Sequence, residues 1–422
     1  MPDLSAIHAE FNRTVFSGRG SLLDVRDRLC AEMEEGVMQD GVWETSQAAI
    51  IPPRDIPSSD PLTRRGLLNA YRLIPRNNNL SDVIPPEGYP IQRQAMIQIC
   101  QWAGIPHAGG FIDKVGADHP KHVAQLLTGI MADQPANRLF RCLGGVLRAF
   151  LSDRYRMISS YDVLVYLLQR LQESGGKVLE GSVTDTHFRI KMISTEIFEK
   201  LEHTRTTTEN WYTGGLGNQE WLSKVGARSL GNLPTQAGVH TAWPCVTFSN
   251  SETGHGALSM IISILMAICY NLASVTEQLA KIHLGEKLPI GVYTPETIDA
   301  ESKVIQLKIR DLLGTAFDQK KFTYLVDQVR PSLDRKIPNP RAAFGAVIKN
   351  SSLVDGMLDS LVDEWYRQQG KSAWDSAQII AEAAKAANAD RAVEIEQIAG
   401  HVALGRFNSA IDKETHLALA NA

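Results

Sequence analysis

The chain has 422 residues, of which 44% are hydrophobic and 21% charged, and it carries a net charge of −4 at pH 7. These values exclude a wholly disordered chain and a histone-like protein that is basic over its whole surface. The five cysteines form no Cys-x-x-Cys pair, which excludes a zinc ribbon and predicts buried thiols in a reducing cytoplasm. No apolar run follows a basic segment at the start, so we expect no signal peptide.

Charge is distributed unevenly along the chain. Residues 1–60 carry 5 basic and 11 acidic side chains, whereas residues 61–160 carry 12 basic and 6 acidic ones. A local positive region can attract an anionic ligand even when the net charge of the protein is negative.

The first third of the chain predicts helices followed by a β-hairpin. Residues 21–37, 91–105 and 121–131 have the apolar spacing of helices. Two alternating segments, 138–143 and 146–151, flank Gly144-Gly145, which is typical of a hairpin with a two-residue turn.

The remaining elements alternate between helix and strand and then become helical. The pattern predicts a helix over 159–176, a strand over 187–194 and two strands within 243–264 around a glycine-containing turn. Residues 271–286 are predicted to be helical. From about residue 296 onward the pattern is also helical, with a loop at 330–345 and an alanine-rich helix at 376–400.

These elements predict an α+β fold. Its central antiparallel sheet, between about residues 137 and 267, would include the hairpin and a packed helix. N-terminal helices and a C-terminal helical region would flank it. The predicted units are an acidic segment at 1–60, a helical lead-in at 61–136, an α+β core at 137–290 with an inserted loop at 196–243, and a helical region at 291–422.

One segment without charged side chains, residues 256–276, is long enough to span a bilayer. Serine and asparagine residues interrupt it, and neither end is enriched in lysine or arginine. We therefore predict a buried strand that leads into a buried helix, and no membrane span.

The predicted hairpin register is the basis of the functional hypothesis. A two-residue turn places Arg141 opposite Arg148 on one face, with Phe150 beside them. Like charges that face each other across strands are destabilising unless an anion or a carboxylate lies between them. The face is therefore either a phosphate-binding surface or a solvated surface neutralised by neighbouring acids.

The predicted nucleic-acid-binding residues lie on and near this hairpin face. The cations would contact phosphates, and the two rings would offer stacking surfaces. The set is Arg141, Arg148, Phe150, Arg154, Tyr155, Arg156, Arg189 and Lys191.

Three ordered segments resemble an uncharacterised phage and plasmid protein family, catalogued as domain of unknown function 932. They are "VLRAFLSDRYRMISSYDVL" from Val146, "VTFSNSETGHGALSM" from Val246, and "ICYNLASV" followed by "AKIHLGE" after Ile268. Leu272 stands where that family usually has glycine. The resemblance covers roughly residues 90–290 and implies a protein of a mobile element, without an agreed activity.

We therefore predict a non-catalytic, cytoplasmic, homo-oligomeric protein that binds single-stranded DNA or RNA and acts in recombination or strand annealing. No cofactor or metal is expected. Two alternatives remain: an interaction or anti-defence factor that does not bind nucleic acid, and a metal-dependent hydrolase. The hydrolase would use Glu252, His255 or the pair His119 and His122.

Overall fold

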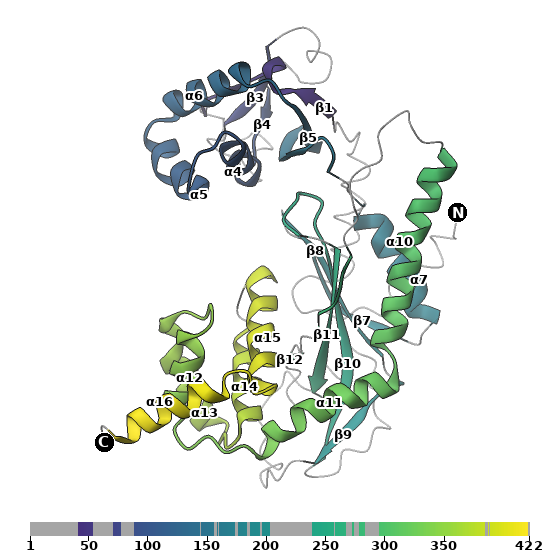
Figure 1. Cartoon of the computed structure of the whole chain (residues 1–422), viewed down its shortest axis with the longest axis vertical. Helices are drawn as coiled ribbons and strands as arrows, with labels where there is room; N and C mark the ends of the chain where they lie inside the picture. Colours follow the sequence, from purple (N-terminus) through teal and green to yellow (C-terminus); the bar gives the residue numbers. More distant parts are fainter. Residues whose placement is uncertain are drawn as a thin grey trace, which may run out of the picture.

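The computed structural model of the chain has a mixed α+β architecture built on antiparallel sheets, which confirms the predicted fold class (Figure 1). It describes residues 41–53, 71–76, 88–143, 145–155, 158, 160–173, 176–183, 186–194, 196–202, 239–256, 258–266, 272–273, 278–282, 295–384, 387 and 389–420. The helix predicted at 21–37 lies outside these residues, as does most of the predicted insertion at 196–243.

The described residues of the N-terminal unit, which spans 41–155, form two small sheets and three α-helices. The first sheet has the order β1 (Gly41–Glu44), β5 (Asn137–Leu143), β6 (Val146–Ser152). The second has the order β2 (Ala48–Ile51), β3 (Arg72–Pro75), β4 (Tyr89–Pro90). The helices are α4 (Arg93–Trp102), α5 (Ala108–Phe111) and α6 (Pro120–Asp133), with a π-helical turn at Ile112–Gly116 after α5.

This unit has a hydrophobic core of its own. Leu73, Met96, Leu127, Met131 and Phe140 are fully buried in it. Helix α6 begins with Pro120, whose missing N–H and fixed φ suit the first helical position. In Figure 1 the unit lies at one end of the molecule, beyond the tip of the largest sheet.

The prediction of a single sheet from residue 137 to 267 is wrong. The hairpin strands β5 and β6 exist as expected, but β5 pairs with β1 and neither strand joins the large sheet. The physical reason is aromatic packing: the ring of Phe150 lies 5.5 Å from that of Trp102 in α4 and 5.1 Å from that of Phe140. The hairpin is therefore part of the N-terminal unit, whose boundary falls after residue 155 instead of at 137.

The large sheet forms the centre of the molecule. Its strands run in the order β12 (Leu272–Ala273), β11 (Leu258–Met266), β10 (Val239–Asn250), β8 (Phe188–Ser194), β7 (Gly176–Val183). Strand β13 (Gln278–Ile282) pairs with β11, and β9 (Glu199–Glu202) pairs with β10.

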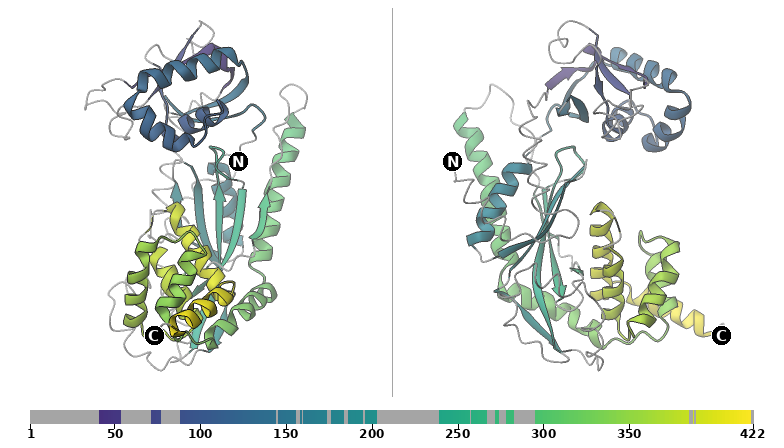
Figure 2. Two further views of the ribbon diagram at one scale, coloured as in Figure 1. Left: turned by 60° about the vertical axis from the view of Figure 1, so that its left-hand side comes forward. Right: turned by 180° about the vertical axis from the view of Figure 1, so that it is seen from behind.

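Helices cover both faces of this sheet (Figures 1 and 2). Alternate residues such as Ile190, Met192 and Phe248 are buried in one core with the apolar stripes of α7 (Ser160–Glu173) and α10 (Pro295–Ala316). The opposite face lies against the C-terminal helices, where Lys191 of β8 meets Glu396. The predicted helix at 159–176 and strands at 187–194 and 243–264 are thus confirmed.

The C-terminal region is helical, as predicted. Its helices are α11 (Gln319–Asp334), α12 (Pro340–Lys349), α13 (Leu358–Arg367), α14 (Ala373–Ala383), α15 (Ala389–Ala403) and α16 (Asn408–Ala420). A reciprocal capping box between Ser372 and Asp375 starts α14. The predicted loop at 330–345 is shorter than expected, because α11 continues through Pro331 and α12 begins at Pro340.

The uncharged segment 256–276 is a strand where the structure describes its first half. Residues 258–266 form β11, as predicted. The helix predicted at 271–286 is wrong, since the described residues there form β12 and β13, both paired with β11. Strand pairing with β11 thus prevails over the local helical pattern. No described helix is long and apolar enough to cross a membrane.

Candidate functional site

The hairpin register differs from the predicted one beyond the turn. Leu143 pairs with Val146 and Cys142 with Leu147, as expected, but Arg141 then pairs with Ala149. Arg148 is the extra residue of a β-bulge. The predicted Arg141–Arg148 pair is therefore wrong, and the repulsion that would have required an anion does not exist. The bulge places Phe140 opposite Phe150, so both rings enter the core against α4.

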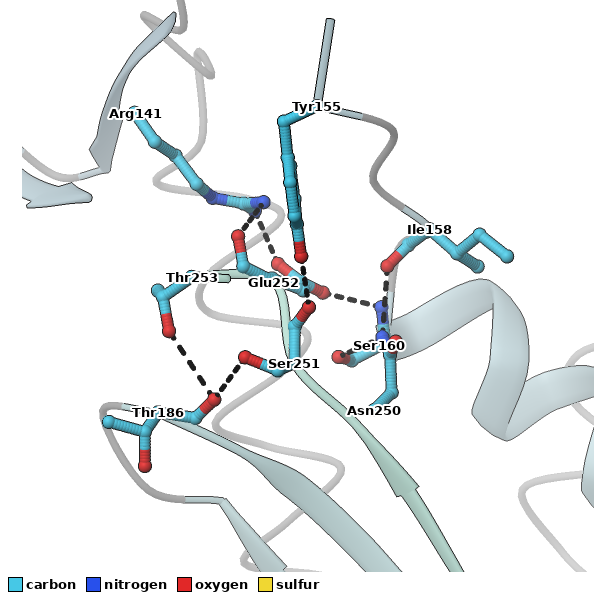
Figure 3. Close-up of polar contacts among 9 residues, drawn as sticks. All are labelled: Arg141, Tyr155, Ile158, Ser160, Thr186, Asn250, Ser251, Glu252 and Thr253. Carbon is cyan, nitrogen blue, oxygen red and sulfur yellow. Dashed lines mark hydrogen bonds and ion pairs between the residues drawn. The ribbon is translucent and has the colours of Figure 1, made fainter. Parts of the chain in front are cut away.

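Arg141 is buried and neutralised by an acid that lies 111 residues away in the sequence (Figure 3). Its side chain is 4% exposed, and its guanidinium forms an ion pair with the Glu252 carboxylate. The same guanidinium donates a hydrogen bond of 3.1 Å to the Glu252 backbone oxygen. The second carboxylate oxygen of Glu252 accepts the backbone N–H of Ser160 at the start of α7. Arg141 therefore joins three parts of the chain and is not part of an exposed face.

The turn between β10 and β11 provides the other side of this junction. The Asn250 amide donates to the Ile158 backbone oxygen (3.0 Å) and to the Ser160 hydroxyl (3.1 Å). The Ser251 hydroxyl donates to the Thr186 backbone oxygen over 2.7 Å. Asn250, Ser251 and Glu252 are consecutive in the turn, so three neighbouring residues contact the hairpin, the start of α7 and Thr186.

Tyr155 and Gln98 complete the junction from the N-terminal unit. The Tyr155 hydroxyl donates to the Ser251 backbone oxygen over 3.0 Å, and burial raises the pKa of this phenol. The Gln98 amide donates to the Thr253 backbone oxygen (2.8 Å), and its oxygen accepts the Phe150 N–H (2.8 Å). We name this contact, made by Gln98, Arg141, Tyr155 and residues 250–254, the hairpin junction.

Gly254 lies directly against the hairpin. Its φ is +80°, and a Cβ there would lie 2.5 Å from the Leu151 side chain of β6. Glycine is required for both the backbone conformation and the contact. The junction as a whole uses polar side chains to hold the N-terminal unit against the tip of the large sheet.

The remaining predicted site residues are scattered. Arg148 is buried at the bulge, Arg154 is exposed after β6, and Arg156 lies outside the described residues. Phe150 is 4% exposed inside the aromatic cluster, so its ring offers no stacking surface.

The two cations predicted on β8 are also not on an open basic face. Arg189 is half-buried and pairs in register with Ser249. The Lys191 ammonium is buried and lies 2.6 Å from the Glu396 carboxylate of α15. The structure therefore does not bring the predicted site residues together on one exposed face.

A groove between β2 and α6 was not predicted. It has a volume of about 600 Å³ and two cations, Arg76 after β3 and Lys121 in the first turn of α6. Both side chains are exposed, and neither forms an ion pair within the described residues. Its lining is Ala49, Ile50, Ile51, Pro52, Arg76, Lys121, Ala124, Gln125, Thr128, Gly129 and Ala132.

The residues of the hydrolase alternative have other contacts. The His119 and His122 rings lie 6.0 Å apart, but no group of three or more His, Cys, Asp or Glu side chains within the described residues is arranged to hold a metal ion. Glu252 is ion-paired with Arg141, and the Ser251 hydroxyl accepts the His255 backbone N–H over 3.0 Å. These contacts hold the β10–β11 turn in place.

A scan against protein-family models and searches of the curated proteins and of the solved structures find no match to this chain.

Proposed function

We propose that the chain binds single-stranded nucleic acid through its N-terminal unit, at the groove between β2 and α6. The observation that carries this proposal is the pair of exposed cations, Arg76 and Lys121, which line one groove without a neutralising acid among the described residues. Cations in that state can release counterions from a phosphate backbone when it binds.

The charge of the surrounding unit supports the proposal. The described residues of the N-terminal unit carry nine basic and five acidic side chains, whereas those of residues 295–420 carry 15 basic and 18 acidic ones. Many cations of the second region are also ion-paired, among them Arg310, Arg335 and Arg367. Among the described residues, the electrostatic attraction for a polyanion is therefore stronger at the N-terminal unit than at residues 295–420.

The position of Lys121 adds to this attraction. It follows Pro120 at the start of α6, where unsatisfied backbone N–H groups give the helix end a partial positive charge. The volume of the groove is in the range of pockets that hold a small molecule, so it suits one strand better than a duplex. Recombination or strand annealing for a mobile element, by an oligomer of this chain, is the function that we propose for such binding.

Binding can be tested by fluorescence anisotropy with a labelled 30-nucleotide strand, at low salt and across a salt titration. The double variant Arg76→Glu/Lys121→Glu is expected to bind about tenfold or more weakly than the wild type. Lys320→Glu/Lys413→Glu is the matched control. It changes the net charge equally at two exposed lysines of the C-terminal region and is expected to bind within about twofold of the wild type.

Two results would overturn the proposal. One is that the wild type does not bind the strand at low salt. The other is an equal loss of affinity in both double variants, because a general charge effect would then explain the binding without the groove.

A further inference from the structure

The groove contains cations but no aromatic ring. None of the described residues that line it is Phe, Tyr or Trp. In the sequence, residues 54–70 and 77–87, which lie outside the described residues, also contain no aromatic residue. Proteins that hold the bases of a single strand usually stack them on aromatic side chains. The described lining of the groove therefore has no aromatic side chain on which a base could stack.

The floor of the groove is open at Gly129. This glycine lies inside α6, and a Cβ built on it would meet no atom within 4 Å. Glycine is a poorer helix former than alanine, and the packing of the unit does not require it here. Its effect is to let a ligand approach the helix backbone closely, between the small side chains of Ala124 and Ala132.

An extended peptide would have little to pair with in this groove. Strand β2 is at the edge of its sheet, but its Ile50 N–H already donates to the Thr128 hydroxyl (2.9 Å). That hydroxyl in turn donates to the Ile50 backbone oxygen over 3.0 Å. Thr128 thus occupies the position where an added strand would form its hydrogen bonds.

We infer that the groove holds a single strand by its sugar–phosphate backbone alone, with the bases directed to solvent. Arg76 and Lys121 contact the phosphates, and the sugars pack on the aliphatic floor around Gly129. This inference rests on the proposed function, and it specifies the ligand as a phosphodiester chain of any base sequence.

The experiment is a competition measurement with four probes of matched length: oligo(dT), oligo(dA), an abasic phosphodiester oligomer and a glutamate-rich peptide. We expect the first three to bind within about threefold of one another. Even one stacked base would make the abasic oligomer bind about fivefold or more weakly. In Arg76→Gln/Lys121→Gln, the slope of log K against log salt should fall by about 1.4 for all three oligomers.

A second variant tests the groove floor. Gly129→Leu fills the open space and should weaken all three oligomers by about tenfold without lowering the Tm, because leucine is a better helix former than glycine. Gly314→Leu is the matched control, since Gly314 also lies inside a helix, α10, with no atom within 4 Å of its Cβ position. It should leave binding unchanged.

The outcomes separate the two proposals. If oligo(dT) binds but the abasic oligomer binds about fivefold or more weakly, or if Gly129→Leu binds like the control, the backbone-only inference is overturned and the proposed function stands. If no oligomer binds, both are overturned. Binding of the glutamate-rich peptide alone would identify the groove as a site for acidic proteins.

Discussion

The hairpin junction and the groove between β2 and α6 use cations from the same positive stretch of the chain in opposite ways. At the junction, Arg141 is almost fully buried, its charge is balanced by the Glu252 carboxylate, and a backbone oxygen accepts one of its N–H groups. In the groove, Arg76 and Lys121 are exposed and form no ion pair within the described residues. A buried charge without a partner has a large desolvation cost, whereas an exposed charge is solvated by water and is accessible to a ligand. Burial and partners, and not the density of arginines in the sequence, distinguish the two roles.

The first test of this contrast is the loss of the junction cation. Arg141→Met leaves the Glu252 carboxylate without its partner and should lower the free energy of unfolding by about 3–5 kcal/mol. Arg76→Met, the same change at an exposed arginine, should stay within about 0.5 kcal/mol of the wild type. Urea denaturation measures both. Equal effects of the two substitutions would show that the junction pair does not stabilise the fold.

A second test addresses the contact between Gly254 and Leu151. Gly254→Ala combines backbone strain at φ +80° with a side-chain clash and should cost about 2–3 kcal/mol. Gly104→Ala measures the backbone strain alone, since Gly104 has φ +75° but no atom within 4 Å of its Cβ position. It should lower the free energy of unfolding by about 1 kcal/mol. The difference in urea midpoint gives the contribution of the contact. The two variants would have the same urea midpoint if the hairpin did not touch the turn.

The third test concerns a buried hydroxyl group in the core of the N-terminal unit. Tyr71 precedes β3, and its hydroxyl donates to the Gly116 backbone oxygen over 2.8 Å. Burial, and to a smaller extent Cys100, raises the pKa of Tyr71 to about 12. The folded state therefore holds this proton more tightly than the unfolded chain, in which the pKa is about 10. The raised pKa of Tyr71 contributes up to about 2 kcal/mol to the free energy of unfolding. This contribution is complete below pH 10 and is lost as the pH rises through 12.

The measurement is the free energy of unfolding from pH 9 to 12 for the wild type and Tyr71→Phe. The variant should lose less stability across this range, because it has no phenol to titrate. Burial also raises the pKa of Cys100, to about 11, but that thiol is present in both proteins. Parallel pH profiles would contradict the assignment.

Much of the secondary structure could be predicted because it depends on local patterns. The hairpin, the leucine stripe of α7, and the alternation of β8, β10 and β11 all follow from residues that are close in sequence. The buried state of Cys100, Cys142 and Cys245 agrees with the expectation from the cysteine pattern. The prediction of a helix at 271–286 was wrong because β12 and β13 form hydrogen bonds with β11. A local sequence pattern does not reveal that partner strand.

The candidate site was much less predictable. The register of the hairpin depended on one bulge, and that bulge is favoured by the burial of Phe140 and Phe150 together against α4. The partner of Arg141 lies 111 residues away, and the partner of Lys191 lies 205 residues away. The excess of basic residues at 61–160 indicated a positive region, but no sequence feature distinguished Arg76 and Lys121 from the other basic residues of that segment.

The amino-acid order was enough to establish an α+β chain with a positive second block, because periodicity and charge counts need no partner. Which cations are neutralised and which remain exposed was decided by tertiary packing, both between the N-terminal unit and the large sheet and between that sheet and α15. The reason is that desolvation depends on what surrounds a charge, and those surroundings come from segments far apart in the chain.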